Sequence, residues 1–246
     1  MAIRRITFLL PLLLSLTVSA CGQQSNDGTY SYKSPSRDGI GKVYMDREIA
    51  SVMSFDGVDW LERNSRTTEE NTNLAIKKLP ITKNSVVADV GAGSGFYAFR
   101  IAKRVPEGKV YAVEIQDDAI KYLVEKSKSL NVNNVQVLKG SIKSTGLPDS
   151  SIDLLIMVDV YHELEFPMEY LQSIKRALKP TARLLLLEYK AEDPAVEIKA
   201  AHKMSVKQVQ RELSANGFRM VQQGSFLPLQ HFLVFEKQES ANIKRK

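Results

Sequence analysis

The residues with the clearest chemical potential form a glycine-rich turn at the end of an apolar run. Asp89 closes the run, and Gly91, Gly93 and Gly95 follow at alternate positions. Glycines in such a turn let the backbone take positive φ and let a ligand approach without meeting a Cβ. A helical pattern begins at Phe96, and a helix N-terminus presents unpaired N–H groups to a polar or anionic ligand. The turn is therefore a candidate ligand site.

A second acid, Glu114, ends the next apolar run of the sequence. A carboxylate at that strand end can accept hydrogen bonds from the 2′- and 3′-hydroxyls of a ribose. The turn lacks the G-x-G-x-x-G spacing of the dinucleotide fingerprint, because Phe96 stands where the third glycine would lie. The glycines and Glu114 fall at the distance of one βαβ unit. This favours a ribose-containing ligand over a turn with only a structural role.

A third group of reactive residues follows a later apolar run. Asp159, His162 and Glu163 stand in the loop after it, and such loops face the ligand in open α/β sheets. His162 has the pKa range of a proton acceptor near neutral pH, and Glu163 could orient it. The alternative is a structural histidine hydrogen-bonded within the loop. The other histidines, His202 and His231, lack ligand spacing, so we expect no metal site.

The elements that would position these residues alternate between strands and helices. Apolar runs predict strands at 86–90, 110–114, 135–138, 152–158 and 184–187, with helices at 66–79, 96–105, 119–130 and 167–178. Such alternation predicts a parallel sheet covered on both faces. After a helix over 206–215, extended segments at 218–226 and 231–236 are separated by too few residues for a crossover. They must therefore pair antiparallel, as a hairpin.

With these elements in order, the chain resembles a class I S-adenosylmethionine-dependent methyltransferase of the type 11 and ubiquinone/menaquinone-methyltransferase-like branch. The motifs that carry the resemblance are VVADVGAGSGFYAFRIA, KVYAVEI, IDLLIMVDVYHEL and LKPTARLLLLEY, within residues 85–236. The resemblance implies a Rossmann-like α/β fold with seven mostly parallel strands and a C-terminal antiparallel hairpin. It also implies an enzyme whose cofactor is S-adenosyl-L-methionine.

The resemblance assigns roles to individual positions. Asp89 and the backbone of residues 91–93 would lie against the methionine moiety, and Glu114 would hold the ribose. The acid that usually reads the adenine amino group is replaced here, so this contact would fall to Ser141 or to a backbone carbonyl. The implied cofactor-binding residues are Asp89, Gly91, Ala92, Gly93, Glu114, Ile115, Ser141 and Asp159, and the catalytic candidates are His162 and Glu163.

The implied reaction is methyl transfer to a small-molecule or lipid-like acceptor, which the sequence does not identify. His162 would take the proton of a protic acceptor, although many methyltransferases need no base. One alternative is an exported, non-catalytic module that binds S-adenosylmethionine or a nucleoside, and another is an NAD-dependent oxidoreductase. We expect no nucleic-acid partner, because the sequence has no basic stripe interleaved with aromatic residues.

The N-terminus carries a separate pattern. Arg4 and Arg5 precede an uncharged apolar run that is too short to span a membrane comfortably, as is typical of a secretory signal. Small residues lead up to Cys21, the only cysteine, and resemble the lipobox of bacterial lipoproteins. We therefore expect a signal peptide over residues 1–20 and a membrane anchor on lipidated Cys21. The alternatives are a plain signal peptide, or a cytoplasmic enzyme translated from Met45.

The remaining sequence predicts a tether and one domain. Residues 21–40 are polar and poor in aliphatics, so we expect a flexible tether. Residues 41–240 suffice for one methyltransferase domain with its core at 66–236. Removing residues 1–20 removes two arginines and no acids, so the net charge falls from +6 to +4. A single cysteine excludes an internal disulfide and a zinc site built from several thiolates.

Overall fold

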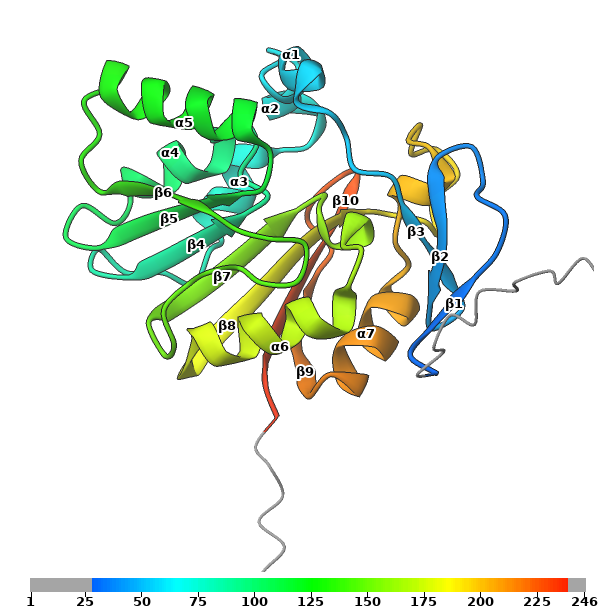
Figure 1. The fold of residues 1–246 in the computed structure, drawn as a ribbon. Coiled ribbons are helices and arrows are strands. Elements are labelled where there is room, and N and C mark those ends of the chain that lie inside the picture. Colours follow the sequence, from blue (N-terminus) through cyan, green and yellow to red (C-terminus); the bar gives the residue numbers. More distant parts are fainter. Residues whose placement is uncertain (1–27, 239–246) are drawn as a thin grey trace, which may run out of the picture.

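The centre of the protein is a seven-stranded sheet, seen in a computed structural model that describes residues 28–238 (Figure 1). Its strand order is β6-β5-β4-β7-β8-β10-β9, and β10 runs antiparallel to β8 and β9 while the other neighbouring pairs are parallel. The strands are β4 (Val86–Val90), β5 (Lys109–Glu114), β6 (Val135–Lys139), β7 (Ile152–Val158), β8 (Leu178–Tyr189), β9 (Phe218–Gly224) and β10 (Gln230–Lys237). The predicted fold with its C-terminal antiparallel hairpin is confirmed.

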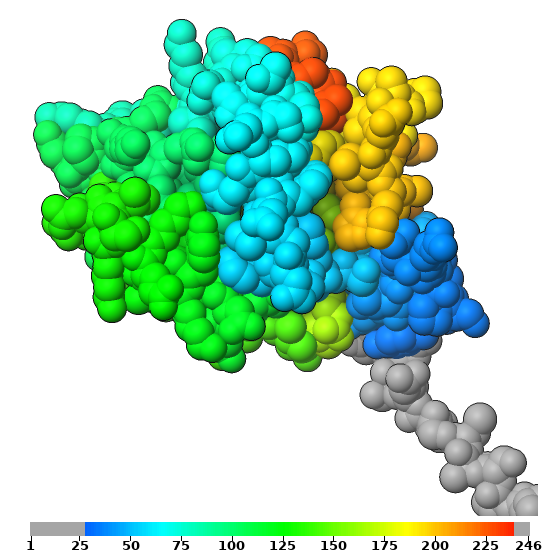
Figure 2. Space-filling model, turned by 90° about the horizontal axis from the view of Figure 1, so that it is seen from above, coloured from blue at the N-terminus to red at the C-terminus, as the bar shows by residue number. Residues whose placement is uncertain are grey.

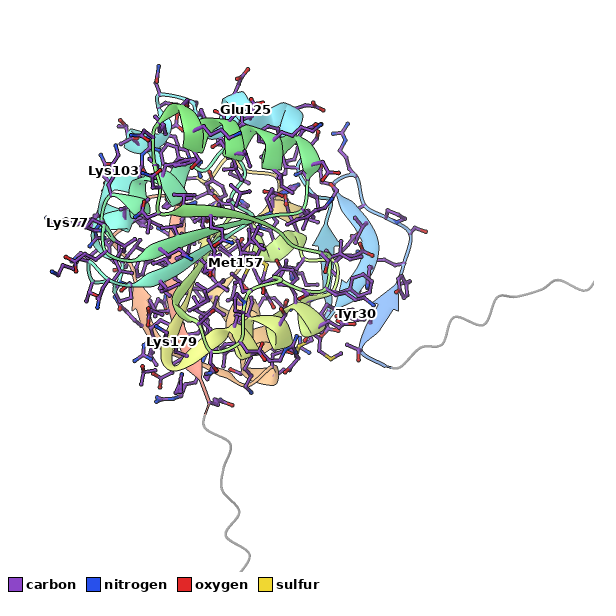
Figure 3. All side chains as sticks on the ribbon, turned by 60° about the vertical axis from the view of Figure 1, so that its left-hand side comes forward. Tyr30, Lys77, Lys103, Glu125, Met157 and Lys179 are labelled. Carbon is purple, nitrogen blue, oxygen red and sulfur yellow. The ribbon has the colours of Figure 1, made fainter. Side chains whose placement is uncertain are left out.

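Helices cover both faces of this sheet (Figure 1). One face carries α3 (Thr72–Lys77), α4 (Phe96–Ala102) and α5 (Asp117–Ser129), and the other carries α6 (Pro167–Ala177) and α7 (Val206–Ala215). Successive residues of β7 enter different apolar clusters, Ile156 on the α4 side and Met157 on the α6 side, because side chains alternate across a strand. Figure 3 shows Met157 in the interior, with Lys77, Lys103 and Lys179 at the periphery.

The helix predicted over residues 66–79 is broken in two. The structure has α2 (Arg66–Glu69) and then α3, and between them Asn71 takes a left-handed conformation with φ 54°. Glu70, just before the break, is fully buried and accepts hydrogen bonds from Arg63, Arg66 and Tyr189. The bond from Tyr189 crosses 119 residues of sequence, so helical periodicity does not reveal the constraint that it places on this segment.

A small antiparallel sheet lies where the sequence predicted part of a tether (Figure 1). Its strands are β1 (Tyr30–Tyr32), β2 (Gly39–Tyr44) and β3 (Arg47–Ala50). The prediction of a flexible tether over 21–40 is therefore wrong for residues 28–40. Tyr30 packs against the rings of Tyr44 and Phe166, and its hydroxyl donates to Glu169 at 2.5 Å. These aromatic contacts bury apolar surface and order the segment. The polar composition of the segment does not predict them.

The N-terminal and C-terminal ends of the chain lie outside residues 28–238, which the structure describes. The predicted signal peptide (residues 1–20) and Cys21 fall outside residues 28–238. Within residues 28–238, none of the helices combines the length and the apolar character that crossing a bilayer requires.

A buried ion pair joins the small sheet to α7. The Nε and Nη2 groups of Arg47 donate to the two carboxylate oxygens of Glu212 at 2.7 and 2.9 Å, and Glu212 is fully buried. The hydroxyl of Tyr161 donates to the same carboxylate at 2.7 Å, and Nη1 of Arg47 donates to the carbonyl of His162 at 3.0 Å. The pair therefore fixes β3 beside the loop that carries His162.

We expect Arg47→Met to lower the free energy of unfolding by about 3–5 kcal/mol, because it leaves the Glu212 carboxylate buried without a cation. Urea unfolding measures the loss. The matched control is Arg211→Met, because Arg211 of α7 pairs with Asp46 of the small sheet at 2.8 Å but both side chains are exposed. This variant should change stability little. Equal losses in the two variants would contradict the prediction.

Candidate active site

A cavity of about 610 Å³ lies at the carboxyl ends of β4, β5 and β7. Ligands of open α/β sheets bind at this edge, and the volume is within the ~300–1,000 Å³ of typical small-molecule sites. The residues singled out from the sequence that line the cavity are Gly91, Gly93, Glu114, Ile115, Ser141, Asp159, His162 and Glu163. Asp89 and Ala92 are not on its wall, and Asp89 is buried with 3% of its surface exposed.

The glycine turn follows β4 and leaves no room for side chains. Gly91 and Gly93 have φ values of 69° and 53°. A Cβ on Gly91 would lie 2.5 Å from Cγ2 of Val160, and a Cβ on Gly93 would lie 2.9 Å from Cδ1 of Leu61. The N–H group of Gly91 donates to the carbonyl of Val113 at 2.9 Å, which ties the turn to β5. The sequence therefore needs glycine here for conformation and for space.

Glu114 ends β5 with its carboxylate held by the backbone. Its Oε2 accepts the N–H of Gly93 at 2.9 Å, and its Oε1 accepts the N–H groups of Ile115 and Gln116 at 2.7 and 3.2 Å. The residue is 4% exposed, yet it lines the cavity. An ionised carboxylate has about four lone-pair sites, so it retains capacity to accept hydroxyl donors. The geometry suits the predicted ribose ligand.

Asp89 is a carboxyl group buried beside this turn. Its Oδ2 is buried with no hydrogen-bond partner among residues 28–238. Burial raises the pKa of Asp89 to about 7, against the opposing effects of the Ala98 backbone amide and the Arg66 guanidinium. Strongly shifted groups concentrate at functional sites. Its predicted role in cofactor binding stays a prediction.

Asp159 follows β7 and is also a buried carboxyl group. Burial raises its pKa well above the usual value, and the carboxylates of Glu70 and Glu188 reinforce the shift. Its Oδ2 accepts from Nε2 of Gln230 at 2.7 Å, whereas its Oδ1 has no partner within the described part of the chain. The backbone is left-handed, with φ 54°. The free oxygen of a cavity-lining acid suits a cationic or hydroxyl group of a ligand.

His162 lies in the turn η2 (Tyr161–Glu163) and is held by a carboxylate that the sequence prediction missed. Its Nδ1 is 2.6 Å from Oε2 of Glu188, and Oε1 of Glu188 accepts the N–H of Tyr161 at 2.9 Å. Burial by itself lowers the pKa of His162, but the Glu188 carboxylate outweighs it and the pKa is raised. Glu163, predicted to orient the ring, has its Oε1 3.8 Å from Nε2. Glu188 is the orienting group instead.

The structure brings a second histidine into the site. His202 belongs to the turn η3 (Ala200–His202), and its Nδ1 lies 3.1 Å from Nε2 of His162. The prediction of scattered histidines is wrong for this pair, although His231 lies apart and bonds Glu192 at 2.9 Å. Glu188 had a readable signal, because it follows a run of four leucines as Glu114 follows an apolar run. His202 had none.

Arg66 is a further lining residue that the sequence prediction missed. Its Nε donates to Glu70 at 3.0 Å, its Nη1 donates to the carbonyl of Leu61 at 3.0 Å, and its guanidinium lies 4.6 Å from the ring centre of Phe96. Phe96 begins α4, directly after the glycine turn. A guanidinium at this place suits an anionic group, because its planar fork matches a carboxylate.

A cover segment, residues 51–61, completes the cavity. It holds the turn η1 (Phe55–Gly57) and the short helix α1 (Val58–Leu61). The N–H of Met53 donates to Oε1 of Glu163 at 3.2 Å, and the N–H of Phe55 donates to Oε1 of Gln116 at 3.0 Å. Seen from above, the cyan chain that includes α1 crosses between α5 in green and the yellow residues near 195 (Figure 2). The cover segment therefore contacts loops at two strand ends.

Asp89 predicts a pH dependence of stability. At pH 5 the folded protein holds the Asp89 proton that the unfolded chain, with an aspartate pKa near 3.8, has released, whereas at pH 8 both states have largely lost it. Stability therefore falls as pH rises and levels off above pH 7. In Asp89→Asn we expect this fall, measured by urea unfolding at the two pH values, to be smaller by about 2–3 kcal/mol. The control Asp118→Asn, at an exposed carboxylate, should behave as the wild type; a wild-type fall in Asp89→Asn would refute the assignment.

Similarity to known proteins agrees with this geometry. A family profile described as "Methyltransferase domain" matches residues 81–237. The chain is 40% identical over 74 residues to the "Probable cobalt-precorrin-6B C(15)-methyltransferase (decarboxylating)" of Methanocaldococcus jannaschii, which is 30% of this chain and 39% of that protein. It is 29% identical over 111 residues to the ubiquinone/menaquinone biosynthesis C-methyltransferase of Pasteurella multocida, 44% of this chain and 41% of that protein.

A solved structure extends the similarity over more of the fold. The crystal structure of a SAM dependent methyltransferase from Aquifex aeolicus matches with a TM-score of 0.71 and 28% identity, covering 75% of this chain and 98% of that one. By contrast, the chain spans less than half the length of the two curated relatives above.

Proposed function

This chain belongs to the methyltransferase domain family of S-adenosylmethionine-dependent enzymes, and we propose that it transfers a methyl group from that cofactor to a small, largely apolar acceptor. One observation carries the proposal: the Glu114 carboxylate and the His162 imidazole line the same cavity. The first suits a ribose and the second suits the proton of an acceptor. Holding the two reactants in one space supplies much of the rate of a displacement reaction.

The residues of the cavity fit the cofactor. Glu114 would accept hydrogen bonds from the ribose hydroxyls, and Gly91 and Gly93 bring the main chain of the turn to the cavity wall beside it. Arg66 would pair with the methionine carboxylate, and the free Oδ1 of Asp159 would accept from its ammonium group. The cofactor supplies a methyl group on a positively charged sulfur. Buried carboxyl groups beside the turn favour such a cation.

The acceptor side of the cavity is mainly apolar. The lining residues outside the cofactor motifs include Val52, Met53, Phe55, Trp60, Leu164, Tyr170 and Ile198. This lining favours an apolar acceptor. Among small-molecule and lipid-like acceptors, a quinone-like ring is supported by the similarity to the ubiquinone/menaquinone methyltransferase. We propose the same branch of the family for this chain, on the same similarity.

His162 would take the proton of a protic acceptor. The hydrogen bond from Nδ1 to Glu188 at 2.6 Å leaves Nε2 as the acceptor atom, and it stabilises the imidazolium that forms. His162 lines the cavity with its Nε2 3.1 Å from Nδ1 of His202, so an acceptor hydroxyl would take the place of His202 at this nitrogen. Glu163 would contact the acceptor. Its carboxylate accepts the N–H of Met53, a residue of the apolar lining where the acceptor would bind.

We expect Glu114→Ala to weaken binding of S-adenosylhomocysteine by about 1–3 kcal/mol, because buried ribose hydroxyls lose their acceptor. Calorimetry measures the affinity, and thermal unfolding checks that the turn survives the loss of three backbone contacts. The control Glu107→Ala, at an exposed carboxylate, should bind as the wild type. Selective binding of NAD would refute the proposed function. Label transferred from methyl-labelled cofactor into a cell extract would then identify the acceptor.

We also propose that the protein is exported and anchored to a membrane through lipidated Cys21. Besides the N-terminal pattern, the small sheet supports this, because translation from Met45 would delete β1 and β2. The buried cluster of Tyr30, Tyr44 and Phe166 would then lose two of its three rings. Tyr30 follows Cys21 by only nine residues, so the domain would lie close to the bilayer.

Mass spectrometry of the protein purified from its native membrane tests this anchor. We expect the mature chain to begin at Cys21 with a diacylglyceryl group, and we expect Cys21→Ala to release the protein from the membrane fraction. A native N-terminus at Met45 would refute both export and lipidation.

A further inference from the structure

A cluster of three metal-ligating side chains lies in the cavity. His162 and Glu163 come from the turn after β7, and His202 comes from the turn before α7. The distance from Nε2 of His162 to Nδ1 of His202 is 3.1 Å. Oε1 of Glu163 lies 3.8 Å from the first nitrogen and 3.5 Å from the second. Two imidazoles and one carboxylate from separate segments thus converge on one point.

We propose that this cluster binds a divalent transition-metal ion of the Zn²⁺ or Fe²⁺ class. The distances carry the proposal. A point equidistant from three atoms with these separations lies about 2.0 Å from each, which is the length of a Zn–N or Zn–O bond. Two histidines and a carboxylate are a donor set that such ions prefer. All three donor atoms can therefore reach one ion from near their observed positions.

The surroundings hold each ligand in the orientation that coordination requires. Glu188 accepts the Nδ1–H of His162, so the lone pair of Nε2 faces the cluster. A carboxylate behind a ligating histidine is the usual support of metal sites in proteins. Glu163 is fixed by the N–H of Met53 at 3.2 Å. The side chains of His162 and Glu163 are only 2% and 13% exposed, so the ligands are already ordered.

The same three side chains can be joined by hydrogen bonds alone. In that state the Nδ1–H of His202 donates to Nε2 of His162, and the imidazole pair is neutral. A metal ion takes the place of the shared proton, which moves to Nε2 of His202, and Nδ1 of His202 and Nε2 of His162 become ligands. A cluster that binds metal takes up Zn²⁺ when the ion is added, whereas a cluster that is only hydrogen-bonded does not. A metal titration therefore distinguishes them.

The cluster faces the cavity, because all three residues line it. An ion there would keep coordination positions open to a ligand, as catalytic rather than structural sites do. Its role rests on the proposed function: the ion would bind the hydroxyl oxygen of the acceptor and lower its pKa, and the proton would pass to solvent. In this state the ion, and not His162, activates the acceptor.

Zn²⁺ titration of the tag-free, full-length protein tests the site. Cys21→Ser in every variant removes the only thiol, and the absence of a histidine tag removes competing imidazoles. We expect one tightly bound ion per chain. We also expect Co²⁺ to give a visible absorption band when it binds. The titration contains neither cofactor nor acceptor, so its result is independent of methyl transfer.

Two variants and a matched control locate the ion. His202→Ala and Glu163→Gln each remove one ligand and should weaken Zn²⁺ binding by about 100-fold, since loss of an outer-shell partner alone costs about 10- to 100-fold. His231→Gln alters the remaining histidine, which bonds Glu192 away from the cavity, and should bind as the wild type. Thermal unfolding with and without Zn²⁺ should show stabilisation in the wild type and in His231→Gln only.

The outcomes separate the two proposals. No Zn²⁺ binding at micromolar concentration, or equal loss in His231→Gln and His202→Ala, would overturn the metal site. Binding of S-adenosylhomocysteine by His202→Ala at wild-type affinity is expected, since Glu114 and the glycine turn are untouched. Loss of Zn²⁺ binding with retained S-adenosylhomocysteine binding supports the site. The proposed function fails separately if the wild type binds Zn²⁺ but no S-adenosylhomocysteine.

Discussion

The cavity depends on one constraint, which is the placement of four acids at one edge of a parallel sheet. Asp89, Glu114, Asp159 and Glu188 lie at or just beyond the carboxyl ends of β4, β5, β7 and β8. The register sets Asp159 level with Glu188, since Val158 pairs with Leu187, and it sets Asp89 three residues deeper than Asp159, since Asp89 pairs with Ile156. Burial raises the pKa of Asp89 and of Asp159, and the nearby carboxylates of Glu114 and Glu188, respectively, reinforce these shifts. The sheet thus concentrates negative potential where a cationic ligand would bind.

This charge is compensated by the loops that cover the edge, and the compensation builds the site. The glycine turn donates to Glu114, the η2 turn donates to Glu188, and Gln230 of β10 donates to Asp159. Each bond that satisfies a buried acid also fixes a loop on the cavity wall. Only Asp89 and Asp159 retain a buried carboxyl oxygen without a partner within residues 28–238.

The fold and the cofactor half of the site follow from local sequence patterns, because strand periods, glycine turns and terminal acids are all short-range signals. Eight of the ten predicted site residues line the cavity for this reason. The β1–β3 sheet was missed, since its stability comes from Tyr30 packing on Phe166, far along the chain. The break at Asn71 was missed in the same way, because Glu70 is held by Tyr189 of β8. The catalytic half was only partly visible, since His202 reaches His162 across 40 residues.

The cover segment makes the two halves of the cavity interdependent. The N–H of Phe55 and the carbonyl of Met53 bond the side chain of Gln116, two residues beyond Glu114. The N–H of Met53 bonds Glu163, beside His162. A ligand that shifts Gln116 therefore moves the backbone of residues 53–55, and the N–H of Met53 in this stretch orients Glu163. Because β3 leads directly into this segment and is fixed to α7 by the Arg47–Glu212 pair, the small sheet anchors one end of the cover. The added N-terminal sheet is thus part of the site rather than an appendage to a complete fold.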